Sequence, residues 1–234
     1  RLNLNAQFFS SPTALFVAVN REQGQQTYLA RVTAASTDLG KLADIADVLN
    51  ALERRDIGPE LAAQRVQEIY TGTGRYGRWL SFLAFPMVAV PATLLLGGGF
   101  KEIPLAATLS SLVGFLAVFT GDSRGLGRLL IPLASMLTAL IATLWCALEG
   151  HTAMMPALIA GMIVLLPGLD LTTATRELST GHLVSGSARL AATALVFATL
   201  AFGLALGSAI GQHFVGEVPQ VEPQQAPVWL VSLS

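Results

Sequence analysis

Residues 129–148 read LLIPLASMLTALIATLWCAL and contain no charged side chain. A helix of about 20 apolar residues crosses a hydrocarbon core of about 30 Å. Four further apolar runs have a similar length; three carry no charge and the fourth carries none from Leu190 onward. A soluble helical bundle would instead show polar residues at helical spacing. The pattern predicts an α-helical membrane protein with about five transmembrane helices in a membrane domain over 77–214, at 79–99, 103–120, 129–148, 152–169 and 188–211.

The composition divides the chain into a soluble part and an apolar part. Only 12% of the 234 residues are charged, whereas a soluble domain has about 25%. Residues 1–78 nevertheless hold nine of the fourteen Lys and Arg. The net charge of −1 argues against a nucleic-acid partner, which requires a basic face. Since Cys146 is the one cysteine, no disulfide within the chain and no cysteine-based metal site is possible, and we predict neither a metal nor a cofactor.

Residues 1–76 predict a small α/β domain. Strand-like patterns cover 2–9, 13–19 and 26–34, and the last two are expected to form a hairpin. Apolar residues at three- and four-residue steps then predict a helix from Leu39 onward, and a second helix begins at Pro59. Because the chain starts at Arg1 and opens directly on a strand, we interpret this domain as incomplete at its N-terminus.

The distribution of Lys and Arg predicts the orientation in the membrane. If the N-terminal domain is cytoplasmic, the outside loops carry only Lys101, which agrees with the positive-inside rule. Residues 215–234 then lie outside, as a Pro- and Gln-rich tail or the start of a sixth span. The inside positions are Arg75, Arg78, Arg124, Arg128, Arg176 and Arg189.

The segment 165–190, LLPGLDLTTATRELSTGHLVSGSARL, carries the candidate functional residues. An apolar run breaks there at Pro167-Gly168 and becomes charged at once. Broken helices form ion and carboxylate sites in secondary transporters, and ionisable residues at membrane depth are functional candidates. The candidates for substrate binding or ion coupling are Pro167, Gly168, Asp170, Arg176, Glu177, Gly186 and Arg189.

The charges of this segment are open to more than one interpretation. Glu177 can carry a coupling proton if burial favours its neutral form, and Arg176 or Arg189 can hold a substrate carboxylate. Alternatively, Glu177 forms a structural ion pair with Arg176 or Arg189. A third possibility is that residues 170–189 are a solvated cytoplasmic loop whose charges fix the topology.

The same segment resembles the signature of the threonine/serine exporter family. The predicted hairpin, followed by Leu39, Lys41 and Leu42, resembles the family's cytoplasmic domain, and the five spans correspond to its first membrane half. Asp170 departs from the pattern, because many relatives carry an uncharged residue there. The matching residues are Pro167-Gly168, Arg176-Glu177-Leu178, Gly181, Ser185-Gly186 and Arg189-Leu190.

The resemblance implies export of threonine, serine or a related organic acid such as a dicarboxylate. The bacterial plasma (inner) membrane would hold the protein, and the proton or membrane potential would drive it. The implied partners are the lipid bilayer, the small amino or organic acid, and a second five-span half or a homo-oligomer. ATP drive within this chain is not expected, because the sequence contains no G-x-x-x-x-G-K-[ST] loop.

We do not expect an enzyme, although the soluble domain of the family has been likened to hydrolases. Residues 1–78 contain no histidine and no G-x-S-x-G motif, so a Ser-His-Asp triad cannot form within this domain. An alternative function is a membrane-anchored interaction or regulatory subunit whose soluble domain binds a partner. A stand-alone channel is a third hypothesis.

Overall fold

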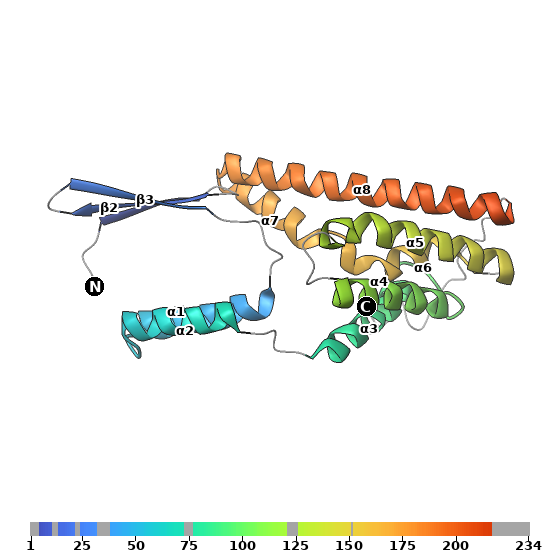
Figure 1. Ribbon diagram of the computed structural model, residues 1–234, viewed down its shortest axis with the longest axis horizontal. Coiled ribbons are helices and arrows are strands. Elements are labelled where there is room, and N and C mark those ends of the chain that lie inside the picture. Colours follow the sequence, from blue (N-terminus) through green and yellow to red (C-terminus); the bar gives the residue numbers. More distant parts are fainter. Residues whose placement is uncertain are drawn as a thin grey trace. The chain divides into compact units, whose positions relative to one another are not determined.

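The computed structural model describes residues 5–10, 14–21, 24–31, 38–72, 77–120, 126–150 and 152–216. The chain divides into two compact units, Arg1–Gly77 and Arg78–Ser234. Figure 1 shows the strands and two helices of the first unit and the helices of the second. The predicted tail from residue 217 onward and two of the predicted inside arginines, Arg75 and Arg124, lie outside the described residues.

The first unit contains a three-stranded antiparallel sheet, which confirms the predicted strands and hairpin. Its strands are β1 (Asn5–Ser10), β2 (Ala14–Arg21) and β3 (Gly24–Arg31), in the order β1-β2-β3. Phe9, Phe16 and Leu29 lie opposite one another across the three strands, and the two phenylalanine rings are 5.9 Å apart between centroids. Aromatic and aliphatic cross-strand neighbours of this kind stabilise the sheet and fix its register.

Two helices follow the sheet in sequence, α1 (Leu39–Glu53) and α2 (Pro59–Thr71). The Asp38 carboxylate accepts a hydrogen bond from the Lys41 backbone N–H at 3.1 Å, so Asp38 caps the start of α1. The Lys41 ammonium group donates to the backbone oxygens of Tyr70 at 3.0 Å and of Gly72 at 2.9 Å. These bonds satisfy carbonyls at the end of α2 and join it to the start of α1.

The second unit is helical throughout its described residues. Its helices are α3 (Arg78–Leu95), α4 (Ile103–Thr120), α5 (Leu126–Glu149), α6 (Met154–Gly161), α7 (Gly168–Ser179) and α8 (Leu183–Val215), with a short 3-10 helix, η1 (Ile163–Leu165), between α6 and α7. The mostly helical chain with a small N-terminal sheet agrees with the predicted fold class.

Each predicted apolar run contains a helix, but the helices differ in their ability to cross a membrane. Three described helices are long and apolar enough to do so, in α3, α5 and α8. The pair Met154–Gly161 and Ile163–Ser179 is a fourth candidate, bent by 52° at its break. Three or four helices of the described residues therefore qualify as candidate spans, where the sequence predicts about five, and α4 contributes a shorter described apolar helix, Ile103–Val118.

Small residues bring α5 and α8 into close contact. Gly203 of α8 packs against Ser135 and the Pro132 carbonyl, Gly207 against the Met136 carbonyl, and Gly211 against Thr143. This is the small-xxx-small packing that lets helix backbones approach. Because the contacts advance in the same direction along both helices, α5 and α8 run parallel, as they do side by side in Figure 1.

α3 and α6 pack against α4. Gly114 of α4 lies against the Phe85 ring of α3, and Gly161 of α6 lies against Leu109 of α4. Leu105 and Leu109 are fully buried in this core. The turn between α3 and α4 lies beside the start of α6, because the Ala153 backbone N–H donates to the Glu102 carboxylate. That turn therefore lies at the end of the unit where α5 ends and α6 begins. Because α8 runs parallel to α5, the turn between α7 and α8 lies at the opposite end, where α5 begins.

Candidate functional site

The candidate residues lie at the break between α6 and α7 and beyond it, along α7 and the start of α8. α6 ends at Gly161, and the chain then passes through η1 and an extended Leu166 before α7 begins. Pro167 occupies the position just before α7 and Gly168 is its first residue. Proline suits this position because the first N–H groups of a helix have no partner within the helix. The structure thus places a break at Pro167-Gly168, where the sequence predicts one, and extends it back to Met162.

Helical geometry places two acidic residues on one side of α7. Asp170 and Glu177 are seven positions apart, close to two full turns, and therefore lie on one side of the helix. The chain reverses at Gly181, which has a positive φ of 84° and so adopts a conformation that glycine allows without strain. Gly186 then lies directly against Leu178, since a Cβ on Gly186 would be only 2.8 Å from the Leu178 Cγ. Gly186 therefore sets the close approach of α7 and α8.

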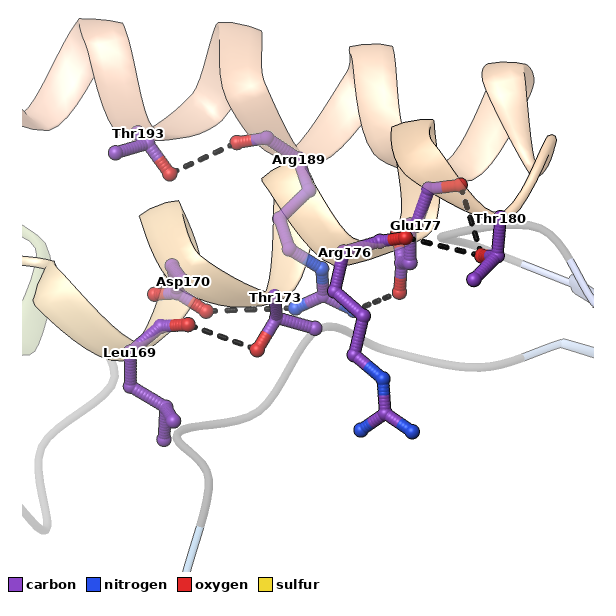
Figure 2. A network of polar contacts seen from close by, with 8 residues as sticks. All are labelled: Leu169, Asp170, Thr173, Arg176, Glu177, Thr180, Arg189 and Thr193. Atoms are coloured by element: carbon purple, nitrogen blue, oxygen red, sulfur yellow. Dashed lines mark hydrogen bonds and ion pairs between the residues drawn. The ribbon is translucent and has the colours of Figure 1, made fainter.

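Arg189 of α8 lies between two carboxylates of α7 (Figure 2). Its Nη1 is 3.4 Å from Oδ1 of Asp170 and its Nη2 is 3.3 Å from Oε1 of Glu177. The side chains of Arg189, Asp170 and Glu177 are 35%, 51% and 22% exposed. We call these three residues the Arg189 cluster. Strong ion-paired hydrogen bonds measure about 2.7–2.9 Å, so both pairs here are long and loosely held.

The Arg189 cluster retains unused hydrogen-bonding capacity. Among the described residues, Oε2 of Glu177 and Nε of Arg189 are buried and have no hydrogen-bond partner. A guanidinium group has five N–H donors and a carboxylate accepts several bonds, so both groups can take a further polar partner. Buried polar atoms without a partner are unusual and mark places where a ligand or water can bind.

The two candidate arginines differ in their environment. Arg176 is exposed, and Figure 2 shows its guanidinium pointing away from Asp170, Glu177 and Arg189. It precedes Glu177 in sequence and so projects from α7 about 100° away around the helix. Of the two ion pairs that the sequence left open for Glu177, the structure contains the one with Arg189.

Hydroxyl groups on α7 were not singled out from the sequence. Thr173 lies beside Asp170 and Arg189 in Figure 2 and donates to the Leu169 carbonyl at 2.8 Å. Thr172, Thr175 and Ser179 donate in the same way to carbonyls four residues earlier. These hydroxyls are donors within the helix and keep lone pairs that can accept a bond. The signal in the sequence was the run Thr172-Thr173 followed by Thr175.

A metal site is not formed within the part of the chain that the structure describes. No group of three or more His, Cys, Asp or Glu side chains lies close enough there to hold a metal ion. The Arg189 cluster brings a cation between two anions, and a guanidinium group forms charge-assisted hydrogen bonds to carboxylates.

Comparison with known protein families finds one family profile that matches most of the chain. The profile of the ThrE family, described as "Putative threonine/serine exporter", matches residues 1–211. The match includes the first unit, all described helices as far as the last turn of α8, and the Arg189 cluster. No solved structure matches the chain.

Curated relatives are distant but match most of the chain. The threonine/serine exporter of Corynebacterium glutamicum is 26% identical over 203 residues, which are 82% of this chain and 40% of that protein. Pheromone-regulated membrane protein 10 of Candida albicans (strain WO-1) is 25% identical over 215 residues, or 89% of this chain and 19% of that protein. The protein of the same name from Yarrowia lipolytica is 24% identical, with 98% of this chain and 20% of that protein covered. The chain thus spans less than half the length of these relatives.

The fold and the family agree with each other. Several described helices are candidate membrane spans, so the chain is a multi-pass membrane protein in contact with lipid. The family groups transporters of small amino acids rather than enzymes. Since the family profile extends over residues 1–211 of 234, this chain belongs to the threonine/serine exporter family.

Proposed function

We propose that this chain is half of a secondary transporter that exports a small amino acid such as threonine or serine, or a related organic acid, from the cytoplasm. The observation that carries the proposal is the Arg189 cluster, which holds one cation between two anions beside the break of a bent span. In secondary transporters, broken helices supply substrate and ion sites of this type. We further propose that the proton or membrane potential supplies the energy.

The charges of the Arg189 cluster favour a zwitterionic substrate. A substrate carboxylate can replace Asp170 or Glu177 at the Arg189 guanidinium, because both existing ion pairs are long. The released carboxylate can then bind the ammonium group of the amino acid. One cation and two anions carry a net charge of −1, so a neutral zwitterion adds no charge. A dicarboxylate would increase the negative charge and bind less readily unless a proton accompanies it.

The proposed orientation places the Arg189 cluster on the cytoplasmic side. Arg78, Arg176 and Arg189 belong to one end of the membrane unit, and Lys101 belongs to the turn at the other end. The positive-inside rule then places the soluble unit in the cytoplasm. We propose the bacterial plasma membrane as the location, with a second five-span half or a second copy of the chain completing the transporter.

Export by reconstituted vesicles tests the proposal. The chain is purified with its partner half, reconstituted, and loaded with radiolabelled threonine, and release is measured after a proton gradient or membrane potential is imposed. We expect release to depend on the gradient, and to fall at least about tenfold in Arg189→Ala, the loss expected for one hydrogen-bonded charge interaction with the substrate. Arg189→Lys keeps the charge but loses the forked geometry, so it should retain an intermediate rate.

Arg176→Ala is the matched comparison for Arg189→Ala. It removes the same charge from the same end of the unit but leaves the Arg189 cluster intact. We expect Arg176→Ala to keep most of the release. Equal rates in Arg189→Ala, Glu177→Gln and the wild type would refute the assignment of the site. Release that does not respond to any imposed gradient would refute the proposed energy source.

A further inference from the structure

A buried carboxylate lies at the end of the membrane unit opposite the Arg189 cluster. Glu102 follows Lys101 in the turn between α3 and α4, and it is 1% exposed. Among the described residues, Glu102 is the only charged residue that is buried. A buried charge requires hydrogen-bond partners to offset its lost hydration, so its contacts indicate its role.

The Glu102 carboxylate joins two segments that are far apart in sequence. Its Oε2 accepts a hydrogen bond from the Gly99 backbone N–H at 2.7 Å, within the same turn. Its Oε1 accepts one from the Ala153 backbone N–H at 3.0 Å. Ala153 is the residue that caps the start of α6, the first half of the bent span. We call these two hydrogen bonds the Glu102 bridge.

Close packing surrounds the Glu102 bridge. A Cβ on Gly98 would be 2.8 Å from Thr93 Cγ2 and 3.2 Å from Pro156 Cβ, so α3 and α6 nearly touch there. On the side of α5, the Cys146 thiol contacts the Thr152 carbonyl oxygen at 3.6 Å and is 2% exposed. Thr152 immediately precedes Ala153 in sequence. The thiol is therefore shielded by the same segment that the Glu102 bridge holds in place.

The bent span is consequently held at both of its ends by polar contacts. At its start, the Glu102 bridge holds α6 to the turn between α3 and α4. At its end, α7 is held to α8 through Arg189. The two places are far apart, because Arg189 and the Gly211–Thr143 contact near Cys146 are separated by 22 residues of α8, or about 33 Å. The break at Met162–Pro167 lies between them.

We propose that Glu102 is a positioning residue for transport, and that the Glu102 bridge opens when the bent span moves. This inference rests on the proposed function of the chain as a transporter. A transporter must open its site alternately to the two sides of the membrane, and the Glu102 bridge closes the side opposite the Arg189 cluster. Once Ala153 moves away, the carboxylate loses a partner and has to be hydrated, so opening admits water at that end.

Cys146 provides a direct test, because it is the one cysteine of this sequence and its labelling is read on its own peptide by mass spectrometry. In vesicles containing the full transporter, a membrane-impermeant maleimide should label Cys146 slowly, and Glu102→Gln should accelerate labelling roughly tenfold to a hundredfold, as loss of a hydrogen bond to a charged group implies. The glutamine amide keeps the size of the side chain, but its NH₂ group faces one of the two backbone N–H donors, so one hydrogen bond of the Glu102 bridge is lost. Lys101→Gln is the matched control, since Lys101 is exposed in the same turn.

A second variant removes the same bond from its other side. Ala153→Pro deletes the donating N–H, and the Ala153 φ of −72° is one that proline adopts. We expect it to accelerate labelling to a similar extent, and the double variant to add little, because both changes break one contact. Labelling of both single variants at the wild-type rate would overturn the proposed role of Glu102.

Labelling during transport tests whether the Glu102 bridge opens in the cycle. Cys146 of the wild type should react faster while the vesicles transport threonine than at rest, and this acceleration should be absent in Arg189→Ala. Unchanged labelling in vesicles that demonstrably transport would overturn the inference while leaving the proposed function intact. Vesicles without transport would instead contradict the proposed function, and the resting rates of the variants would still decide whether Glu102 closes that end.

Discussion

The contact between α5 and α8 makes a quantitative prediction for Gly207→Ala. An added Cβ would overlap the Met136 carbonyl oxygen and lie 2.9 Å from the carbonyl carbon and 3.0 Å from Ala139 Cβ. The obstacle is backbone, which cannot rotate away, so the two helices have to separate. Because the obstacle is rigid backbone, the cost lies in the upper part of the range for overpacking, about 2–3 kcal/mol. Alanine's higher helix propensity offsets roughly 1 kcal/mol, which leaves a net loss of about 1–2 kcal/mol.

Thermal unfolding of the purified protein in detergent measures this loss. For a chain of this size each kcal/mol corresponds to about 2–4 °C, so the midpoint should fall by roughly 2–8 °C. Ala205→Val is the matched control, because it adds volume to an exposed position of the same helix and should change the midpoint by less than about 2 °C. Adding Met136→Ala should not restore stability, since the overlap is with the carbonyl. A wild-type midpoint for Gly207→Ala would refute the reasoning.

Three further changes test other contacts. In a double-mutant cycle of unfolding, Arg189→Ala and Glu177→Gln should show a coupling free energy of about 0.5–1 kcal/mol, because the ion pair is partly exposed. Additive effects of the two changes would contradict the ion pair. Gly114→Ala should lower the unfolding midpoint, and Phe85→Leu should partly restore it, since the added Cβ would meet the Phe85 ring at 2.8 Å; no rescue would argue against this contact. Asp38→Ala should weaken the cap of α1 by about 1 kcal/mol, seen as about fivefold faster amide exchange in its first turn, and unchanged exchange would count against the cap.

The membrane helices could be predicted from the sequence because the hydrophobic effect acts over whole segments. Uncharged runs of about 20 residues have few alternatives to a helix in lipid, so each run contains a helix. The number of full spans was harder to predict. The segment after Gly161 changes to a 3-10 helix before Pro167, so one predicted run becomes a bent pair of helices. Composition does not record where a run of this kind breaks.

The Arg189 cluster could be predicted only in part. Given that 168–179 is helical, the seven-residue spacing of Asp170 and Glu177 places both on one face. The choice between Arg176 and Arg189 required the register of α7 against α8, which depends on the contact between Gly186 and Leu178. Glu102 could not be distinguished from an ordinary loop charge, because its burial arises from a hydrogen bond to Ala153, 51 residues away.

The length of α8 has a mechanical consequence. Its 33 residues extend about 50 Å, whereas the hydrocarbon core is about 30 Å thick. Arg189 stands immediately before the uncharged part of the helix, so a single rigid rod contains both the membrane anchor and the arginine. A change of a few degrees in the tilt of α8 therefore displaces Arg189 relative to the lipid headgroups without any hinge. Tilting is one way in which a long helix accommodates a thinner bilayer, so bilayer thickness and the position of the Arg189 cluster are linked through α8.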